Sequence, residues 1–229
     1  MEAIILAGGL GTRLRAAVPD VPKCMAPVAG KPFIDHVIQE ALNAGVNRFI
    51  FSLGYMHEVI EKHLHQNYPD LDISITVEAN PLGTGGGIKA ACTHTNESNC
   101  IVLNADTLFR VDLKKLMNYH LQHKAICSLA LKPMHNFDRY GAVKINKDGF
   151  IQSFEEKKPV KKGLINGGVY VLNIPAFLSF GLPEKFSFEK DFLEAWLDSE
   201  TMMGLVQEGY FVDIGIPEDF IKADKDLAA

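Results

Sequence analysis

A chain of 229 residues with 47% hydrophobic residues is long enough to bury one sizeable core, and α/β domains of this length commonly stay undivided, so we expect one domain spanning residues 1–229. The formal net charge of -5 excludes a general nucleic-acid-binding surface, because such a surface needs a basic face to displace phosphate counterions. Any anionic ligand would therefore bind in a local pocket.

The first predicted element is a buried strand at Ala3–Ala7, an unbroken apolar run. This run is too short, and its flanks are wrong, for a signal peptide or a membrane span. We therefore expect a cytoplasmic protein that does not bind membranes.

Strands and helices then alternate through the first half. Apolar residues recur at helical spacing from Phe33 to Leu42, and Gly45 follows as a C-cap. The next predicted elements are a strand at Arg48–Leu53, a helix at Glu58–His65, a strand at Ile73–Val77, a helix starting at Gly87–Cys92 and a strand at Cys100–Leu103. Such alternation predicts a parallel sheet with helices on both faces, and ligands outside the carboxyl ends of its strands.

The second half changes to strands joined by tight turns. The predicted elements are a helix at Leu113–His123, strands at Ile126–Lys132, Ala142–Ile145, Phe150–Phe154 and Gly168–Leu172, a helix near Phe188–Leu197, a strand at Tyr210–Asp213 and a helix from Pro217. We interpret residues 111–229 as a substrate-binding part built into the same sheet as residues 1–110, and not as an independent domain.

A glycine-rich loop, Gly8-Gly9-Leu10-Gly11-Thr12-Arg13-Leu14, follows the first strand. Glycines let backbone N–H groups approach phosphate oxygens, and Arg13 adds a permanently charged guanidinium. A Rossmann dinucleotide site is disfavoured, because Leu14 replaces the third glycine and Leu53-Gly54-Tyr55 offers no ribose-binding carboxylate. A Walker P-loop is excluded, since no lysine followed by Ser or Thr closes the loop.

The glycine-rich loop and several later motifs resemble those of the sugar-1-phosphate nucleotidylyltransferases. The motifs follow the order of this family along nearly the whole chain. The further matching segments are Pro22-Lys23, Pro27–Pro32, Pro81–Gly87, Asn104-Ala105-Asp106, Phe154–Pro159, Asn166–Tyr170 and Asp213–Asp219. The resemblance implies an α/β, Rossmann-like, mixed and mostly parallel sheet flanked by helices. It also implies the activity: a nucleoside triphosphate reacts with a sugar 1-phosphate, releasing pyrophosphate.

The resemblance assigns nucleotide binding to the two glycine-rich loops and their flanks. The assigned residues are Leu6, Ala7, Gly8, Gly9, Gly11, Thr12, Arg13, Pro81, Leu82, Gly83 and Thr84. Glu78 joins this set for a chemical reason: guanine presents two adjacent donors, N1–H and the N2 amino group, which one carboxylate can accept. A solvated loop residue is the alternative interpretation of Glu78.

The transfer needs charge neutralised on two anions, and an acidic protein must supply that charge locally. Arg13 and Lys23 are the candidate catalytic cations near the triphosphate, with Asp106 the third catalytic candidate. Asp106 and Asp213 each end a predicted strand and are expected to hold one Mg²⁺ against the phosphates. Taken singly, either aspartate could instead be a helix N-cap.

The sugar side follows from the resemblance. In this family the pair equivalent to Glu156 and Lys157 lines the sugar pocket, with the glutamate on hydroxyls and the lysine on the sugar phosphate. The sugar 1-phosphate site is completed by the remaining members of the motifs, Asn104, Gly141, Asn166 and Gly167. A solvated charge run is the alternative interpretation of Glu156 and Lys157.

The other candidate metal ligands are weak. The pairs His63 with His65 and His120 with His123 have suitable spacing, but no third ligand accompanies them, so exposed helix positions are expected. The cysteines lack any C-x-x-C pair, which predicts reduced, buried thiols: Cys24, Cys92, Cys100 and Cys127.

Within the family, the resemblance is closest to the short heptose 1-phosphate guanylyltransferases, which implies GTP and D-glycero-α-D-manno-heptose 1-phosphate as substrates. Mannose 1-phosphate, or a uridylyl or thymidylyl transfer, remains an alternative of the same class. A Rossmann dehydrogenase and a non-catalytic nucleotide sensor are alternatives from other classes. The sequence is compatible with a homo-oligomer but does not fix the number of subunits.

Overall fold

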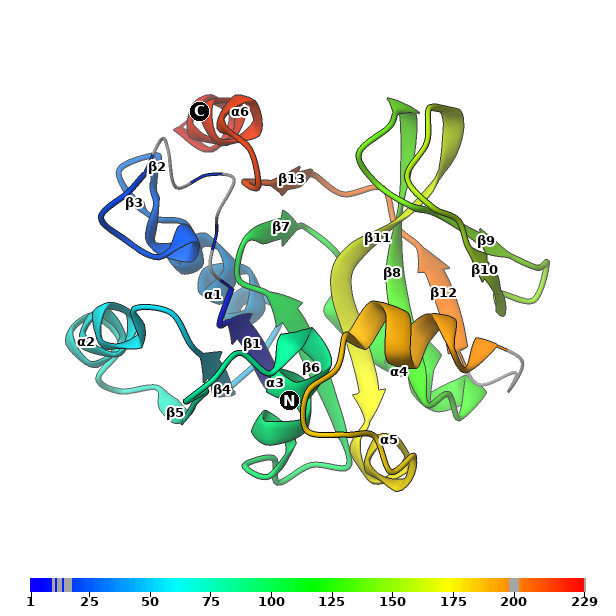
Figure 1. The fold of residues 1–229 in the computed structure, drawn as a ribbon, viewed down its shortest axis with the longest axis horizontal. Coiled ribbons are helices and arrows are strands. Elements are labelled where there is room, and N and C mark those ends of the chain that lie inside the picture. The colour runs from blue at the N-terminus through cyan, green and yellow to red at the C-terminus, as the bar shows by residue number, and fades with distance from the viewer. Residues whose placement is uncertain (10, 12–13, 15–17, 198–201, 229) are drawn as a thin grey trace.

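The computed structural model describes residues 1–9, 11, 14, 18–197 and 202–228. Strands from both halves of the chain form a nine-stranded mixed sheet in the order β10-β9-β11-β6-β1-β4-β5, with β8 paired to β11 and β12 paired to β8 (Figure 1). Its strands are β1 (Glu2–Ala7), β4 (Arg48–Leu53), β5 (Asp72–Val77), β6 (Asn99–Asn104), β8 (Cys127–Phe137), β9 (Ala142–Ile145), β10 (Ile151–Phe154), β11 (Val160–Asn173) and β12 (Met202–Val206).

The remaining elements are helices and two small two-stranded sheets, β2–β3 and β7–β13. The helices are α1 (Phe33–Asn43), α2 (His57–Asn67), α3 (Gly83–Cys92), α4 (Leu113–His123), α5 (Ile174–Ser179), α6 (Pro217–Ala228), the 3-10 turn η1 (Lys23–Met25) and the π-helix η2 (Phe188–Glu194). The short strands are β2 (Pro27–Val28), β3 (Lys31–Pro32), β7 (Thr107–Phe109) and β13 (Phe211–Asp213).

The four strands β5, β4, β1 and β6 are mutually parallel, and Ile4 lies level with Ile50 on one side and Val102 on the other. Side chains of a strand alternate between the two faces of a sheet. Accordingly Ile5 belongs to the core that contains α1, α2 and α4, whereas Ile4 belongs to the core that contains α3, α5 and η2. The predicted mixed sheet, with parallel strands at its centre and helices on both faces, is confirmed.

The first difference from the sequence analysis is the start of α3. The helix begins at Gly83 and not at Gly87, and its first glycines pack against the segment that contains Glu184 and Phe186. A Cβ on Gly86 would lie 2.2 Å from the carbonyl oxygen of Glu184, and one on Gly85 would lie 2.1 Å from the Phe186 ring. The absent side chains permit this close packing.

Several element boundaries also differ, and some elements were not predicted. Strands β8 and β11 are longer than predicted, while the unpredicted elements are α5, β12 and the short η1, β2, β3 and β7. The Ala142–Ile145 strand and the Leu113–His123 helix have the predicted bounds, and the turn between β9 and β10 has the expected glycine, Gly149, at a φ of 90°.

The expected exposure of His120 is wrong. This side chain is 1% exposed, with Nδ1 3.0 Å from Ser128 Oγ and Nε2 3.1 Å from Asn99 Oδ1. Burial lowers the pKa of His120 to about 4, so the imidazole is neutral near pH 7. All four cysteines are free and buried, as predicted.

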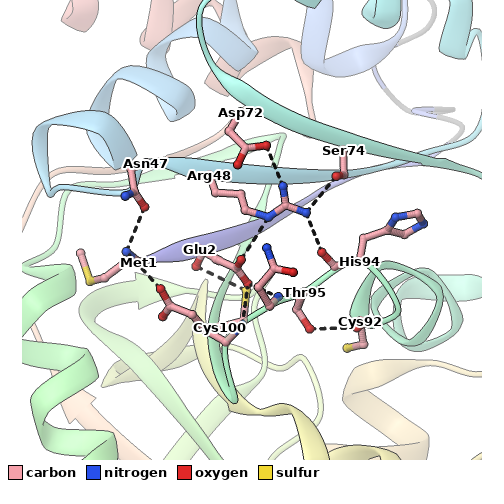
Figure 2. Close-up of polar contacts among 12 residues, drawn as sticks. Met1, Glu2, Asn47, Arg48, Asp72, Ser74, Cys92, His94, Thr95 and Cys100 are labelled. Carbon is pink, nitrogen blue, oxygen red and sulfur yellow. Dashed lines mark hydrogen bonds and ion pairs between the residues drawn. The ribbon is translucent and has the colours of Figure 1, made fainter.

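The edge of the sheet at the amino ends of β1, β4 and β5 is fixed by a charge network around the buried Glu2 (Figure 2). The Arg48 guanidinium pairs with Glu2 at 3.1 Å and Asp72 at 2.7 Å, and donates to Ser74 Oγ at 3.0 Å. Glu2 Oε2 also accepts hydrogen bonds from the backbone N–H groups of residues 96 and 97. The opposite edge, at the carboxyl ends of the strands, carries the candidate site.

Candidate functional site

Three adjoining hollows lie at the carboxyl ends of the parallel strands. The loop hollow, about 270 Å³, lies along Gly8, Gly9, Glu78 and Thr84. The inner hollow, about 180 Å³, is lined by Ala7, Gly11 and Lys23, and the strand hollow, about 530 Å³, by Lys157 and Asn166. Asp106 is the one described residue that lines all three hollows.

Asp106 and Asp213 face the same ammonium group. Lys23 Nζ lies 2.6 Å from Asp106 Oδ2 and 3.3 Å from Asp213 Oδ1. The Lys23 side chain is only 12% exposed, whereas the two carboxylates keep more contact with solvent. The structure therefore brings together three charged residues that the sequence analysis selected, and the lysine ammonium bridges the carboxylates.

Backbone geometry holds this trio in place. Strands β7 and β13 pair so that Asp213 lies opposite Thr107, and the N–H of Ile214 donates to the Asp106 carbonyl at 3.1 Å. Asp213 Oδ1 accepts the N–H of Gly215 at 2.7 Å. On the other side, Gly11 has a φ of 58°, and a Cβ there would lie 2.8 Å from Lys23 Cβ. Glycine is therefore needed at position 11 both for backbone conformation and for space.

The loop hollow is organised around Glu78. One carboxylate oxygen, Oε2, accepts the backbone N–H of Leu82 at 2.8 Å, and Oε1 accepts from Ser52 Oγ at 3.4 Å. A Cβ on Gly8 or Gly87 would lie within 2.9 Å or 2.8 Å of Glu78 Oε1. Glu78 thus shapes the turn before α3 while lining the hollow, as do the predicted residues Leu6, Pro81 and Gly83.

A bulge in β11 forms one wall of the strand hollow. Between Asn166 and Tyr170 the register against β8 shifts, and Gly168 in this stretch has a φ of 71°. Asn166 Nδ2 donates to the Tyr170 hydroxyl at 2.9 Å. Bulges redirect side chains and commonly lie beside functional sites. Four further predicted residues also line this hollow: Asn104, Gly141, Lys157 and Gly167.

One predicted sugar-side residue is not in the hollow wall. Glu156 is exposed and lines none of the three hollows, although its neighbour Lys157 lines the strand hollow. The preceding acid, Glu155, pairs with Lys144 and with Lys158. The predicted residues Thr12 and Arg13 lie outside the described residues.

The strand hollow also has lining residues outside the predicted motifs, among them Arg139, Tyr140 and Glu189. Arg139 and Tyr140 directly precede Gly141, so their place beside a predicted glycine was a usable signal. Arg139 pairs with Asp219 at the start of α6. Glu189 comes from η2, and no motif marked it.

The thiol beside Lys23 is not a nucleophile. Burial, with a further contribution from the Asp106 charge, raises the pKa of Cys24 to about 12, so the thiolate is not populated near neutral pH. Within the described ranges, no three His, Cys, Asp or Glu side chains gather into a metal-binding cluster. No helix in the described part of the chain is both long and apolar enough to span a membrane.

Comparison with known proteins finds relatives along the whole chain. The chain is 47% identical over 227 residues to D-glycero-alpha-D-manno-heptose 1-phosphate guanylyltransferase of Aneurinibacillus thermoaerophilus, covering 99% of this chain and 98% of the relative. It is 43% identical over 220 residues to the protein of the same name from Campylobacter jejuni, covering 96% and 97%. The structure of HddC from Yersinia pseudotuberculosis complexed with GMP-PN is similar at a TM-score of 0.87, with 36% identity and 99% of each chain covered. A family model described as Nucleotidyl transferase matches residues 2–229, and the chain belongs to this family.

Proposed function

We propose that the chain transfers a guanylyl group from GTP to D-glycero-α-D-manno-heptose 1-phosphate, giving GDP-heptose and pyrophosphate. Two relatives that match over almost their full lengths carry this activity in their names, and a similar structure was solved with GMP-PN. The observation that carries the proposal is the meeting of three hollows at Asp106, beside Lys23. Two substrates bound in separate hollows would react at their junction.

The nucleotide occupies the loop and inner hollows. Gly8, Gly9 and Gly11 let the backbone approach the phosphates, and Lys23 neutralises their charge. Arg13 adds a second cation from the same loop on the strength of the family motif. The base lies at the Glu78 end, where the carboxylate accepts guanine N1–H and the N2 amino group.

The sugar 1-phosphate occupies the strand hollow, which is the largest of the three. Lys157 holds its phosphate, the amides of Asn104 and Asn166 bind hydroxyls, and Gly141 and Gly167 permit close approach. Glu156 is the weakest member of this set, since its side chain is exposed and would have to turn toward the hollow. Residues 1–110 would thus bind the nucleotide and residues 111–229 the sugar, within a single domain.

Asp106 and Asp213 fit a magnesium ion that is shared with the substrate. Mg²⁺ is commonly held by one or two carboxylates and completed by phosphate oxygens and water, so a cluster of three protein ligands is not required. When bound, the ion would neutralise the phosphate charge during transfer. Lys23 Nζ would then leave the carboxylates and turn to the triphosphate.

The reaction is an in-line displacement. An oxygen of the sugar phosphate attacks the α-phosphorus, the new P–O bond forms, and the bond to the β-phosphate oxygen breaks to release pyrophosphate. The attacking oxygen is already anionic, so no general base is needed, and the protonated state of Cys24 agrees with the absence of a covalent intermediate. Positioning and charge neutralisation supply the catalysis.

The test is pyrophosphate release measured with each component omitted in turn. We expect release only when GTP, the heptose 1-phosphate and Mg²⁺ are all present. Turnover that continues without the sugar phosphate would identify a hydrolase and overturn the proposal.

A further inference from the structure

Glu189 connects the walls of two hollows. It lines the strand hollow, and its Oε2 accepts a 2.7 Å hydrogen bond from the hydroxyl of Thr84, which lines the loop hollow. The same oxygen accepts from Ser187 Oγ at 3.0 Å. No described residue donates a hydrogen bond to the other oxygen, Oε1. One half of the carboxylate is therefore fixed, while the other half has acceptor capacity left beside the strand hollow.

The Thr84 hydroxyl is itself held on both sides. It accepts the backbone N–H of Phe188 at 2.9 Å while it donates to Glu189. Around it, the first turn of α3 is tied to the segment before η2, because Gly85 N–H donates to the Phe186 carbonyl at 3.1 Å and Phe186 N–H donates to the Leu82 carbonyl at 3.0 Å. Movement of the α3 start would therefore move Glu189 as well.

The surroundings of Glu189 suit a hydroxyl-bearing ligand. Asn166 and Tyr170 line the same hollow, which also contains Lys157 as a cation for a phosphate. Carboxylate oxygens accept hydrogen bonds from hydroxyl groups, and such charge-assisted bonds are stronger than neutral ones. A fixed carboxylate with one oxygen left over is suited to select a sugar by the placement of its hydroxyls.

We propose that Glu189 binds sugar hydroxyls through Oε1, and that Thr84 is a positioning residue that fixes this carboxylate and couples it to the nucleotide loop. This inference rests on the proposed function of the site. A purely structural role is the competing explanation, since an acidic residue in the first turn also stabilises a helix. That role predicts lower stability without a selective loss of sugar affinity.

The experiment measures two affinities in each variant by calorimetry. Heptose 1-phosphate is titrated into enzyme holding Mg²⁺ and a non-hydrolysable GTP analogue, and the analogue is titrated separately. Glu189→Gln keeps the shape but removes the charge, and we expect sugar affinity to fall about tenfold or more. Affinity for the analogue should stay within about twofold, which also shows that the variant is folded. The matched control is Glu194→Gln, an exposed acid of the same helix, which should change neither affinity.

Thr84 is tested by two substitutions. Thr84→Val removes the hydroxyl and should weaken sugar binding several-fold, whereas Thr84→Ser keeps the hydroxyl and should restore it. Combining Thr84→Val with Glu189→Gln should add little to the single Glu189 variant, because the two residues act as one unit.

The outcomes separate this inference from the proposed function. If the wild type binds heptose 1-phosphate but Glu189→Gln binds it equally well, or loses both affinities alike, Glu189 is not a sugar ligand. If Thr84→Val and Thr84→Ser bind the sugar equally, the Thr84 hydroxyl does not position the Glu189 carboxylate. If the wild type itself binds no heptose 1-phosphate, the proposed function fails first.

Discussion

Replacing Lys23 by methionine should increase the metal affinity of the nucleotide-free protein. The ammonium group lies 2.6 Å from Asp106 and 3.3 Å from Asp213, the two carboxylates that we assign to Mg²⁺. A metal ion must therefore displace Lys23 Nζ before it can bind both. Lys23→Met keeps a long unbranched side chain but has no ammonium group. It therefore removes the competition with the metal ion and also the ability to hold phosphate.

The size of the effect follows from the two ion pairs. A hydrogen bond to a charged group contributes about 1.5–3 kcal/mol in proteins. Because the carboxylates are 39% and 27% exposed, solvent screens the pairs, and we take the lower figure of about 1.5 kcal/mol for each. The competition then amounts to about 3 kcal/mol at most, so we expect a gain in affinity of about 10- to 100-fold.

The assay is Mn²⁺ binding followed by electron paramagnetic resonance in the absence of nucleotide. Lys23→Arg keeps the positive charge and should show no comparable gain, and Lys157→Met, which removes a lysine of the strand hollow without touching the carboxylates, serves as the control. Unchanged or weaker binding in Lys23→Met would refute the competition. The same variant should lose guanylyl transfer, because Lys23 no longer neutralises charge on the triphosphate.

The remaining predictions concern the metal, the sugar phosphate and stability. Asp106→Asn and Asp213→Asn should each raise the Mg²⁺ concentration needed for activity. If both variants show the Mg²⁺ dependence of the wild type, the two aspartates are not metal ligands. Lys157→Ala should raise the KM for sugar phosphate far more than the KM for GTP. An effect on the KM for GTP alone would assign this lysine to the nucleotide site instead. Arg48→Met should lower the free energy of unfolding by about 3 kcal/mol, because Glu2 is left buried without its cation, and a urea-denaturation loss below about 1 kcal/mol would contradict this. His120 has a folded pKa lowered from 6.5 to about 4, so its contribution to stability is present above pH 6.5 and is lost as pH falls toward 4. Between pH 7 and pH 5 the free energy of unfolding of the wild type should fall by about 2 kcal/mol through this group. His120→Asn should lack this fall, and an equal pH dependence of the free energy of unfolding in the two proteins would contradict the prediction.

The parallel centre of the sheet was predictable because its signals are local. Buried runs such as Ala3–Ala7 and Arg48–Leu53 alternate with helical patterns, and this order leaves few topologies. The position of Asp106 followed from the same logic, since parallel strands end at one edge. The pairing of Asp106 with Asp213 through Lys23 did not follow, because it depends on β7 pairing with β13 across more than a hundred residues.

The glycines of α3 show a limit of pattern reading. The resemblance assigns the glycine-rich segment Pro81–Gly87 to nucleotide binding, as a second glycine-rich loop. In the structure, Gly83, Gly85 and Gly86 face the segment around Phe186, so packing explains their missing side chains. Glycine permits close approach both by a ligand and by another segment of the protein, and the sequence does not indicate which of the two packs against it.

His120 illustrates a signal that was present and given too little weight. Leu113, Leu116, Met117 and His120 follow helical spacing, so the histidine lies on the buried stripe of α4. Its polarity suggested exposure, but Ser128 and Asn99 satisfy both ring nitrogens inside the core. A polar residue on an apolar stripe is buried when such partners are available.

The most direct test of the central claim is a competition among nucleotides for one sugar. GTP, ATP, CTP, UTP and dTTP at equal concentrations are incubated with Mg²⁺, the protein and D-glycero-α-D-manno-heptose 1-phosphate, and a parallel reaction contains mannose 1-phosphate. Products are separated and identified by mass. We predict GDP-heptose as the dominant product, with the preference for GTP reduced in Glu78→Gln. A dominant uridine or thymidine product would contradict the guanylyl assignment, and equal or faster use of mannose 1-phosphate would contradict the heptose assignment.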